Sequence, residues 1–265
     1  MSDAPIIPIP PNIAQLTGPL LLGHFFNWGL FGCLCIQTYI YYLSFPNDRK
    51  LPQVLVVVVF TIELLQTVLS TRDAFRNFGT GWGNFADLNE IGWLWFSVPV
   101  LGTVITTIAQ MFFAWRIWIL SKKLYLPVPI ALICLVQCIS GIWVGIWSHL
   151  IGVFSNVQHH TYKLTSIWLG GTALGDGIIA VSMIYYLTRS RTGFQSTNLL
   201  ITRIIRITVE TGLICATFAI LDLSFFLAFQ DNNYHLAASV PLSKLYANSL
   251  LVVLNARVRI VGARG

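Results

Sequence analysis

Six ionisable side chains lie inside the long apolar stretches of this sequence, and their types are those that can do chemistry. A charge at the middle of a bilayer costs ~2.5–3.5 kcal/mol on insertion scales, so such residues usually face a bundle interior or a hydrated cavity. A buried carboxyl group can serve general acid catalysis, proton coupling or ligand binding. The six residues are His24, Glu63, Asp176, Glu210, Asp222 and Lys244.

Lys244 is the one ammonium group in this set, so it can neutralise only one carboxylate directly. The other carboxyl groups must be protonated, hydrogen-bonded or hydrated. For Glu210 we predict a pair with Arg206, which lies four residues earlier on the same helix face. One interpretation of the other ionisable residues is purely structural: an ion pair and hydrogen bonds from nearby amides would hold the helices together. The other interpretation is a single ligand pocket formed by His24, Glu63, Gln66, Asp176, Asp222, Lys244 and Asn248.

Two local patterns favour placing these side chains inside a bundle. The stretch FTIELLQT puts Glu63, Gln66 and Thr67 on one helix face, because residues three and four apart are neighbours on a helix. Asp176 stands between Gly175 and Gly177, and small residues let another helix or a ligand approach closely. If the protein is an enzyme, we expect Glu63 and Asp222 to be the catalytic residues.

The composition excludes a soluble protein. Apolar residues make up 55% of the chain and charged residues 10%, and the mean hydropathy is +0.72. A soluble domain carries about 25% charged residues, so this chain cannot cover a water-facing surface. The five cysteines all lie in apolar stretches, which does not indicate a disulfide framework. The adjacent His159 and His160 have no third ligand nearby, and we predict neither a metal nor a cofactor.

Seven segments meet the length of ~20 apolar residues needed to cross a bilayer. The sequence therefore predicts an all-α bundle of seven transmembrane helices over residues 15–255, with an N-terminal segment over 1–14 and a basic tail over 256–265. The expected helices are Gln15–Phe45, Pro52–Ser70, Ile91–Leu120, Pro127–Phe154, Leu164–Leu187, Leu199–Phe229 and His235–Asn255.

The distribution of lysine and arginine predicts the orientation. Twelve basic residues flank the helices on one side of the membrane, and three (Arg72, Arg76 and Lys163) fall on the other. Cytoplasmic loops carry the excess of basic residues, so we expect the N-terminus outside and the C-terminus in the cytoplasm. This orientation gathers Glu63, Asp176, Asp222 and Lys244, with His24 above them, in the middle and outer half of the bundle. The outer loop over 71–90 is rich in glycine and aromatic residues, which fits an interfacial loop or a lid.

Several stretches together resemble one fungal family. They are NWGLFGCLCIQTYIYYLSFPNDR, IELLQT, QMFFAWRIWILSKK, WLGGTALGDGIIAVSMIYYLTRSRTGF, TVETGLICATFAILDL and KLYANSLLVVLNAR. The combination is similar to the seven-helix membrane proteins of mushroom-forming fungi that are known only as a domain of unknown function. The resemblance covers nearly the whole chain. It implies a fungal source and seven spans, and it brings no activity and no catalytic residues.

Better-known seven-helix proteins differ at their diagnostic positions. Trp115 stands directly before Arg116, where rhodopsin-like receptors carry an acidic residue. Val240 stands four residues before Lys244, where microbial retinal proteins carry an aspartate. The fungal membrane-bound meroterpenoid cyclases place acidic residues comparably to Glu63 and Asp222, which is an analogy of layout.

The function that we expect is the binding of a small lipophilic molecule in a polar intramembrane pocket, in the manner of a receptor or sensor. The alternatives are an integral-membrane enzyme with terpenoid-cyclase-like acid catalysis and a proton-coupled transporter. The expected partners are membrane lipids and the lipophilic ligand or substrate, with no nucleic acid. The plasma membrane or the endoplasmic reticulum is the expected location, and the oligomeric state stays open.

Overall fold

The computed structural model describes residues 13–81, 90–189, 195–229 and 233–257. Within these ranges seven helices are long and apolar enough to cross a membrane, which indicates an integral membrane protein. The prediction of an all-α bundle with seven membrane-length helices is confirmed. The helices are α1 (Ile13–Ser44), α2 (Lys50–Phe75), α4 (Thr103–Ser121), α5 (Pro127–Ile151), α6 (Phe154–Arg189), α7 (Gln195–Ala228) and α8 (Leu236–Asn255).

Three helix boundaries differ from the predicted ones by five residues or more. The second helix continues past Ser70 to the end of α2 and then into a wider helical turn, η1 (Arg76–Thr80). Part of the predicted outer loop is therefore helical. Residues 82–89 of that loop lie outside the described ranges. The third helix begins with the loosely wound η2 (Phe96–Gly102), which contains Pro99. Helix α6 begins ten residues before the predicted Leu164, because the polar run after Phe154 lacks apolar periodicity but still forms helical backbone hydrogen bonds, such as Val157 N to Val153 O at 3.3 Å.

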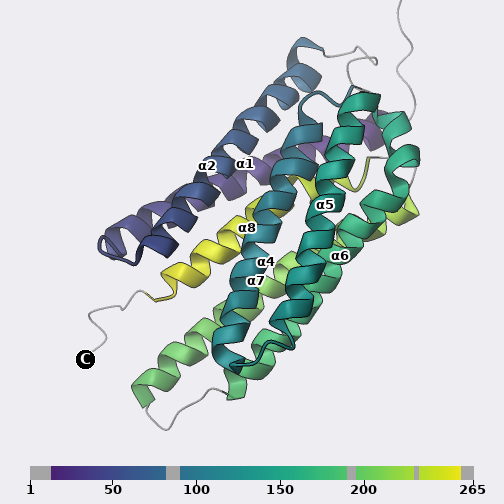
Figure 1. Ribbon diagram of the computed structural model, residues 1–265. Coiled ribbons are helices and arrows are strands. Elements are labelled where there is room, and N and C mark those ends of the chain that lie inside the picture. The colour runs from purple at the N-terminus through teal and green to yellow at the C-terminus, as the bar shows by residue number, and fades with distance from the viewer. Residues whose placement is uncertain (1–12, 82–89, 190–194, 230–232, 258–265) are drawn as a thin grey trace, which may run out of the picture.

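Helix α8 is the central element of the bundle. It packs against α1, α2, α4 and α7, and 83% of the residues in its membrane-spanning window are buried, the largest share among the seven helices. Figure 1 shows α8 between the α1–α2 pair on one side and α4 with its neighbours on the other. Any polar side chain on α8 therefore faces protein and needs a protein partner.

Glycines allow the closest helix contacts. A Cβ added at Gly141 of α5 would lie 2.2 Å from Thr103 Oγ1, and one at Gly145 would lie 2.5 Å from Val100 Cγ2. A Cβ at Gly23 of α1 would lie 2.8 Å from the carbonyl oxygen of Leu236, the first residue of α8. Small residues at these positions let the backbones approach, as in other membrane helix pairs.

The two ends of the bundle differ in their charged contacts. At the end formed by residues 45–49, 122–126 and 256–257, called here the Asp48 end, Arg257 Nη2 pairs with Asp48 Oδ2 at 2.6 Å. This hydrogen bond holds the pKa of Asp48 at about 2, below its ordinary 3.8. At the opposite end, formed by residues 90–95 and 152–153 and called the Gly92 end, Arg76 pairs with Glu90 at 3.0 Å. Which end faces the cytoplasm stays a prediction, as does the division into an N-terminal segment, a membrane domain and a tail.

Candidate functional site

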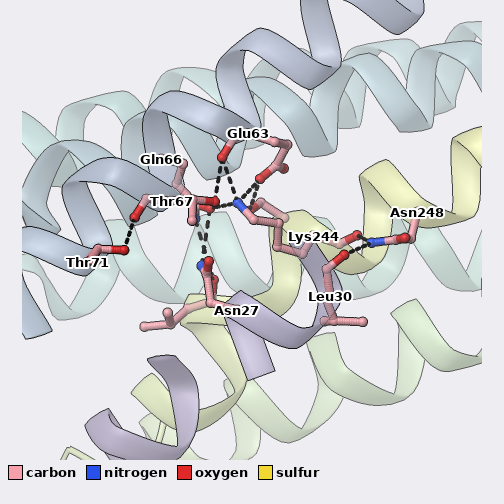
Figure 2. A network of polar contacts seen from close by, with 10 residues as sticks. Asn27, Leu30, Glu63, Gln66, Thr67, Thr71, Lys244 and Asn248 are labelled. Atoms are coloured by element: carbon pink, nitrogen blue, oxygen red, sulfur yellow. Dashed lines mark hydrogen bonds and ion pairs between the residues drawn. The ribbon is translucent and has the colours of Figure 1, made fainter. Parts of the chain in front are cut away.

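A seam of polar side chains runs between α1, α2 and α8. Its centre is an ion pair between Lys244 Nζ and Glu63 Oε2, with both side chains fully buried. Lys244 Nζ also donates to Gln66 Oε1 and, at 3.0 Å, to the main-chain oxygen of Glu63. Figure 2 shows Glu63 and Gln66 reaching from α2 towards the Lys244 ammonium. A desolvated pair persists only when further hydrogen bonds satisfy it, and these contacts supply them.

The seam continues on both sides of this pair. Asn27 Nδ2 donates to Gln66 Oε1 at 3.2 Å and to Val240 O at 3.3 Å (Figure 2). Asn248 Nδ2, one turn after Lys244, donates to Leu30 O at 3.0 Å. Because α1 approaches α8 closely at Gly23, Asn27 of α1 reaches the α8 backbone and Asn248 of α8 reaches the α1 backbone.

His24 lies at the Gly92 end of the seam. Its Nδ1 is 2.7 Å from Ser70 Oγ, and its ring stacks on Trp28. The side chain is fully buried, and its Nε2 has no hydrogen-bond partner. Its partner Ser70 stands two helical turns after Glu63 on α2, so His24 does not contact the Lys244 ion pair.

Asp176 belongs to a second polar set on the other side of α8. Gln110 Nε2 donates to its Oδ1 at 2.8 Å, and the Tyr246 hydroxyl donates to its Oδ2. Gln137 donates in turn to Gln110 Oε1. A Cβ at Gly175 would lie 3.3 Å from Gln110 Nε2, so the glycine beside Asp176 admits the amide that binds it.

Asp222 is the third buried carboxyl group, and it has no hydrogen-bond partner at either oxygen. The side chain is fully buried on α7, and the Ser239 hydroxyl of α8 lies close enough to interact with it weakly, outside hydrogen-bond geometry. A buried polar group left unpaired is costly, so each such group calls for an explanation. The neighbouring cavity provides one.

A cavity, called here the outer cavity, lies at the Gly92 end between η2, α5, α6, α7 and α8. Its free volume is about 80 Å³, within about 670 Å³ of non-atom space that includes its opening to the outside. Aliphatic and aromatic side chains form much of its wall, and hydroxyls and an imidazole interrupt it. Its lining includes Trp95, Val144, Trp168, Phe226, His235 and Ser239. Asp222 does not line the cavity itself: it lies next to Ser239, which does, and one turn before Phe226 on α7.

His235 gives the outer cavity a neutral polar atom. Burial lowers the pKa of this imidazole to about 4, so it is uncharged at neutral pH. Its Nδ1 has no hydrogen-bond partner. The cavity thus combines apolar walls with unpaired polar atoms, the combination that is typical of small-molecule sites.

A narrow space lies between the outer cavity and the seam. It shares Val98, Trp168 and Ser239 with the outer cavity and extends to Ser243. Ser243 Oγ lies 3.4 Å from Glu63 Oε2. Two serine hydroxyls one helical turn apart on α8 therefore lead from Asp222 to the Glu63–Lys244 pair.

The residues predicted for one pocket fall into three sets. Glu63, Gln66 and Lys244 are in contact, and Asn248 and His24 extend the same seam. Asp176 and Asp222 each have separate surroundings. Their assignment to ligand binding stays a prediction. Glu210 is exposed on α7, and the side chain of its predicted partner Arg206 lies outside the described residues.

Sequence reasoning missed several lining residues, above all Ser239, Ser243 and His235. The spacing of the two serines, four residues apart on the helix that carries Lys244, was a usable signal because it places them on one face. His235 at the helix start gave no such signal.

The comparisons with known proteins assign no activity. Residues 172–259 match the profile described as "Family of unknown function (DUF6534)". The match includes Asp176, Asp222 and Lys244 and excludes Glu63. The comparison with curated proteins found no match, and neither did the comparison with solved structures. The fungal source stays a prediction.

Proposed function

We propose that this protein binds a small lipophilic molecule in the outer cavity and acts as a receptor or sensor. The observation that carries the proposal is the fully buried Asp222, with both carboxyl oxygens unpaired, beside Ser239 in the wall of a largely apolar cavity. Apolar walls supply affinity for a lipophilic body, and a few placed polar atoms fix its orientation. Glu63 is a weaker candidate for ligand contact, because Lys244 already occupies it.

The cavity favours a ligand with an apolar body and one hydrogen-bond donor. Trp95, Trp168 and Phe226 offer aromatic faces to the body. Asp222 accepts hydrogen bonds when ionised, and His235, with its unpaired Nδ1, lines the cavity. A hydroxyl or amine group on the ligand would satisfy Asp222 and remove the cost of its burial.

The expected orientation places this cavity on the outer side of the membrane. Arg49, Lys122, Lys123 and Arg257 lie at the Asp48 end, which we assign to the cytoplasm by the excess of basic residues. The outer cavity lies at the opposite end. A molecule from the outside or from the outer leaflet would then reach it without crossing the ion pair.

Mass spectrometry of a solvent extract of the purified full-length protein tests the proposal. We expect a small molecule to co-purify and to fall at least ~10-fold in the variants Val144→Phe, which fills the cavity, and Asp222→Asn, which removes the charge. Ile146→Phe is the matched control, because Ile146 is on the same helix but 43% exposed. Monodisperse size-exclusion profiles show that the variants fold. Identical extracts from all four proteins would overturn the proposal.

Acid catalysis on a lipophilic substrate is a second candidate, which the unpaired Asp222 favours. Cations are stabilised over aromatic faces, and Trp95 and Trp168 line the same cavity. Asp222 is a better proton donor than Glu63 here, because Glu63 is held in the Lys244 ion pair. Incubation of membranes with prenylated epoxides distinguishes the two functions: cyclised product that is lost in Asp222→Asn indicates the enzyme.

A further inference from the structure

A second cavity, called here the inner cavity, lies between α4, α6, α7 and α8. Its free volume is about 20 Å³, room for a single water-sized group, and it shares no lining residue with the outer cavity. Its polar lining is made of one carboxyl group, three hydroxyls and a thiol. These belong to Asp176, Thr208, Tyr246, Ser249 and Cys215. The cavity therefore gathers oxygen atoms from three helices around a single acidic group.

The acidic group has only neutral partners. Gln110 and Tyr246 each donate one hydrogen bond to Asp176, and none of the ion pairs among the described residues includes it. Each carboxylate oxygen can accept a further bond. A carboxylate without a cation inside a membrane is costly, and a small cation beside it would remove that cost.

Thr208 provides an independent indication of a ligand. Its residue is 4% exposed, and its Oγ1 has no hydrogen-bond partner although it lines the inner cavity. Threonines in membrane helices usually bond back to the carbonyl four residues earlier, as Thr211 does to Ile207 O at 2.9 Å and Thr217 to Leu213 O at 2.8 Å. The Thr208 hydroxyl is thus left for a group inside the cavity.

We propose that the inner cavity binds a small monovalent cation such as Na⁺. Carboxylate and hydroxyl oxygens are the ligands that hard cations prefer. A single carboxylate is neutralised by one positive charge, whereas a divalent ion would leave a net charge inside the membrane. The occupied site would join Asp176 of α6 to Thr208 of α7 and to α8 through Tyr246 and Ser249.

Thermal unfolding of the purified full-length protein, followed by tryptophan fluorescence, tests this site. NaCl replaces choline chloride at constant ionic strength and pH, since choline is too large to enter among these side chains. For a dissociation constant of about 30 mM, about 0.3 M Na⁺ would raise Tm by about 3–6 °C. Asp176→Asn should abolish this rise.

Thr208→Val separates ion binding from a structural role. The variant removes an unpaired buried hydroxyl, so in choline chloride it should unfold at the same temperature as the parent or higher. It should nevertheless lose most of the response to Na⁺. Thr217→Val is the matched control on the same helix and should keep the response, because Thr217 is exposed and bonded to its own backbone.

Two results would overturn the proposal. One is a parent protein whose Tm is the same in both salts. The other is a response to Na⁺ that survives in both Asp176→Asn and Thr208→Val. Asp222→Asn, which removes the buried carboxyl group next to the outer cavity, should leave the Na⁺ response intact, so this test does not depend on the ligand of the outer cavity.

Discussion

Replacing Lys244 by methionine removes the only cation of the seam and leaves the Glu63 carboxylate buried. In the parent protein the Lys244 ammonium contacts Glu63 Oε2, the Glu63 main-chain oxygen and Gln66 Oε1. Without it, the remaining donor to the Glu63 carboxylate is Ser243 at 3.4 Å, and Glu63 Oε1 has no partner even in the parent. Methionine fills a similar volume, so the change tests charge rather than packing.

The expected loss in the free energy of unfolding follows from these contacts. Breaking a buried pair by removing one partner costs about 3–5 kcal/mol, because the other charge stays desolvated. Glu63→Gln should cost less, about 1.5–3 kcal/mol, since the ammonium keeps Gln66 and the Glu63 main-chain oxygen. The double variant carries no uncompensated charge. We expect it to lose at least ~2 kcal/mol less than the sum of the two single losses.

Reversible unfolding in mixed micelles with increasing dodecyl sulfate measures these free energies, with tryptophan fluorescence as the signal. The four proteins form a double-mutant cycle. Additive losses, or a loss below ~1 kcal/mol for Lys244→Met, would refute the inference that the two charges stabilise each other inside the bundle.

Two further predictions concern the Asp48 end and helix packing. Since Arg257 lowers the pKa of Asp48 to about 2, its contribution is complete above the ordinary value of 3.8 and is lost as the pH falls towards 2. Arg257→Gln should therefore cost about 1 kcal/mol near neutral pH, and unfolding curves of variant and parent should converge in acid. Gly141→Ala should cost about 1–3 kcal/mol in the same assay, because its Cβ would meet Thr103 Oγ1 at 2.2 Å. Gly170→Ala, with open space around the new methyl group, should be neutral or stabilising.

The number and type of the helices could be predicted because the bilayer imposes a length and a polarity on each span. Their ends could not, because helices continue beyond the apolar stretch. Asp73 illustrates this, since it lies after the predicted end of the second helix and is nevertheless buried. It accepts the Trp93 amide at 2.9 Å and 3.1 Å across the Gly92 end. Such a contact depends on the path of a loop and leaves no periodic signal.

The site was predictable only in part, for a related reason. The face of Glu63 and Gln66 follows from helical spacing, and the structure places both against Lys244. The partner of Asp176 does not follow from spacing, because Gln110 and Tyr246 come from two other helices. Rotation of each helix about its axis decides which polar faces meet, and it depends on packing at positions such as Gly23 and Gly175.

Glu63, Asp176 and Asp222, the three buried carboxyl groups of the predicted pocket, differ in their hydrogen-bond and charge partners. This difference indicates where a ligand would bind. Glu63 has a cation, and Asp176 has two neutral donors. Asp222 has no hydrogen bond and yet is fully buried. A ligand donor at Glu63 would have to displace the Lys244 ammonium, whereas at Asp222 it would relieve an unpaired group and displace no protein contact. The free energy available to a bound molecule is therefore greatest beside Asp222, where the outer cavity lies.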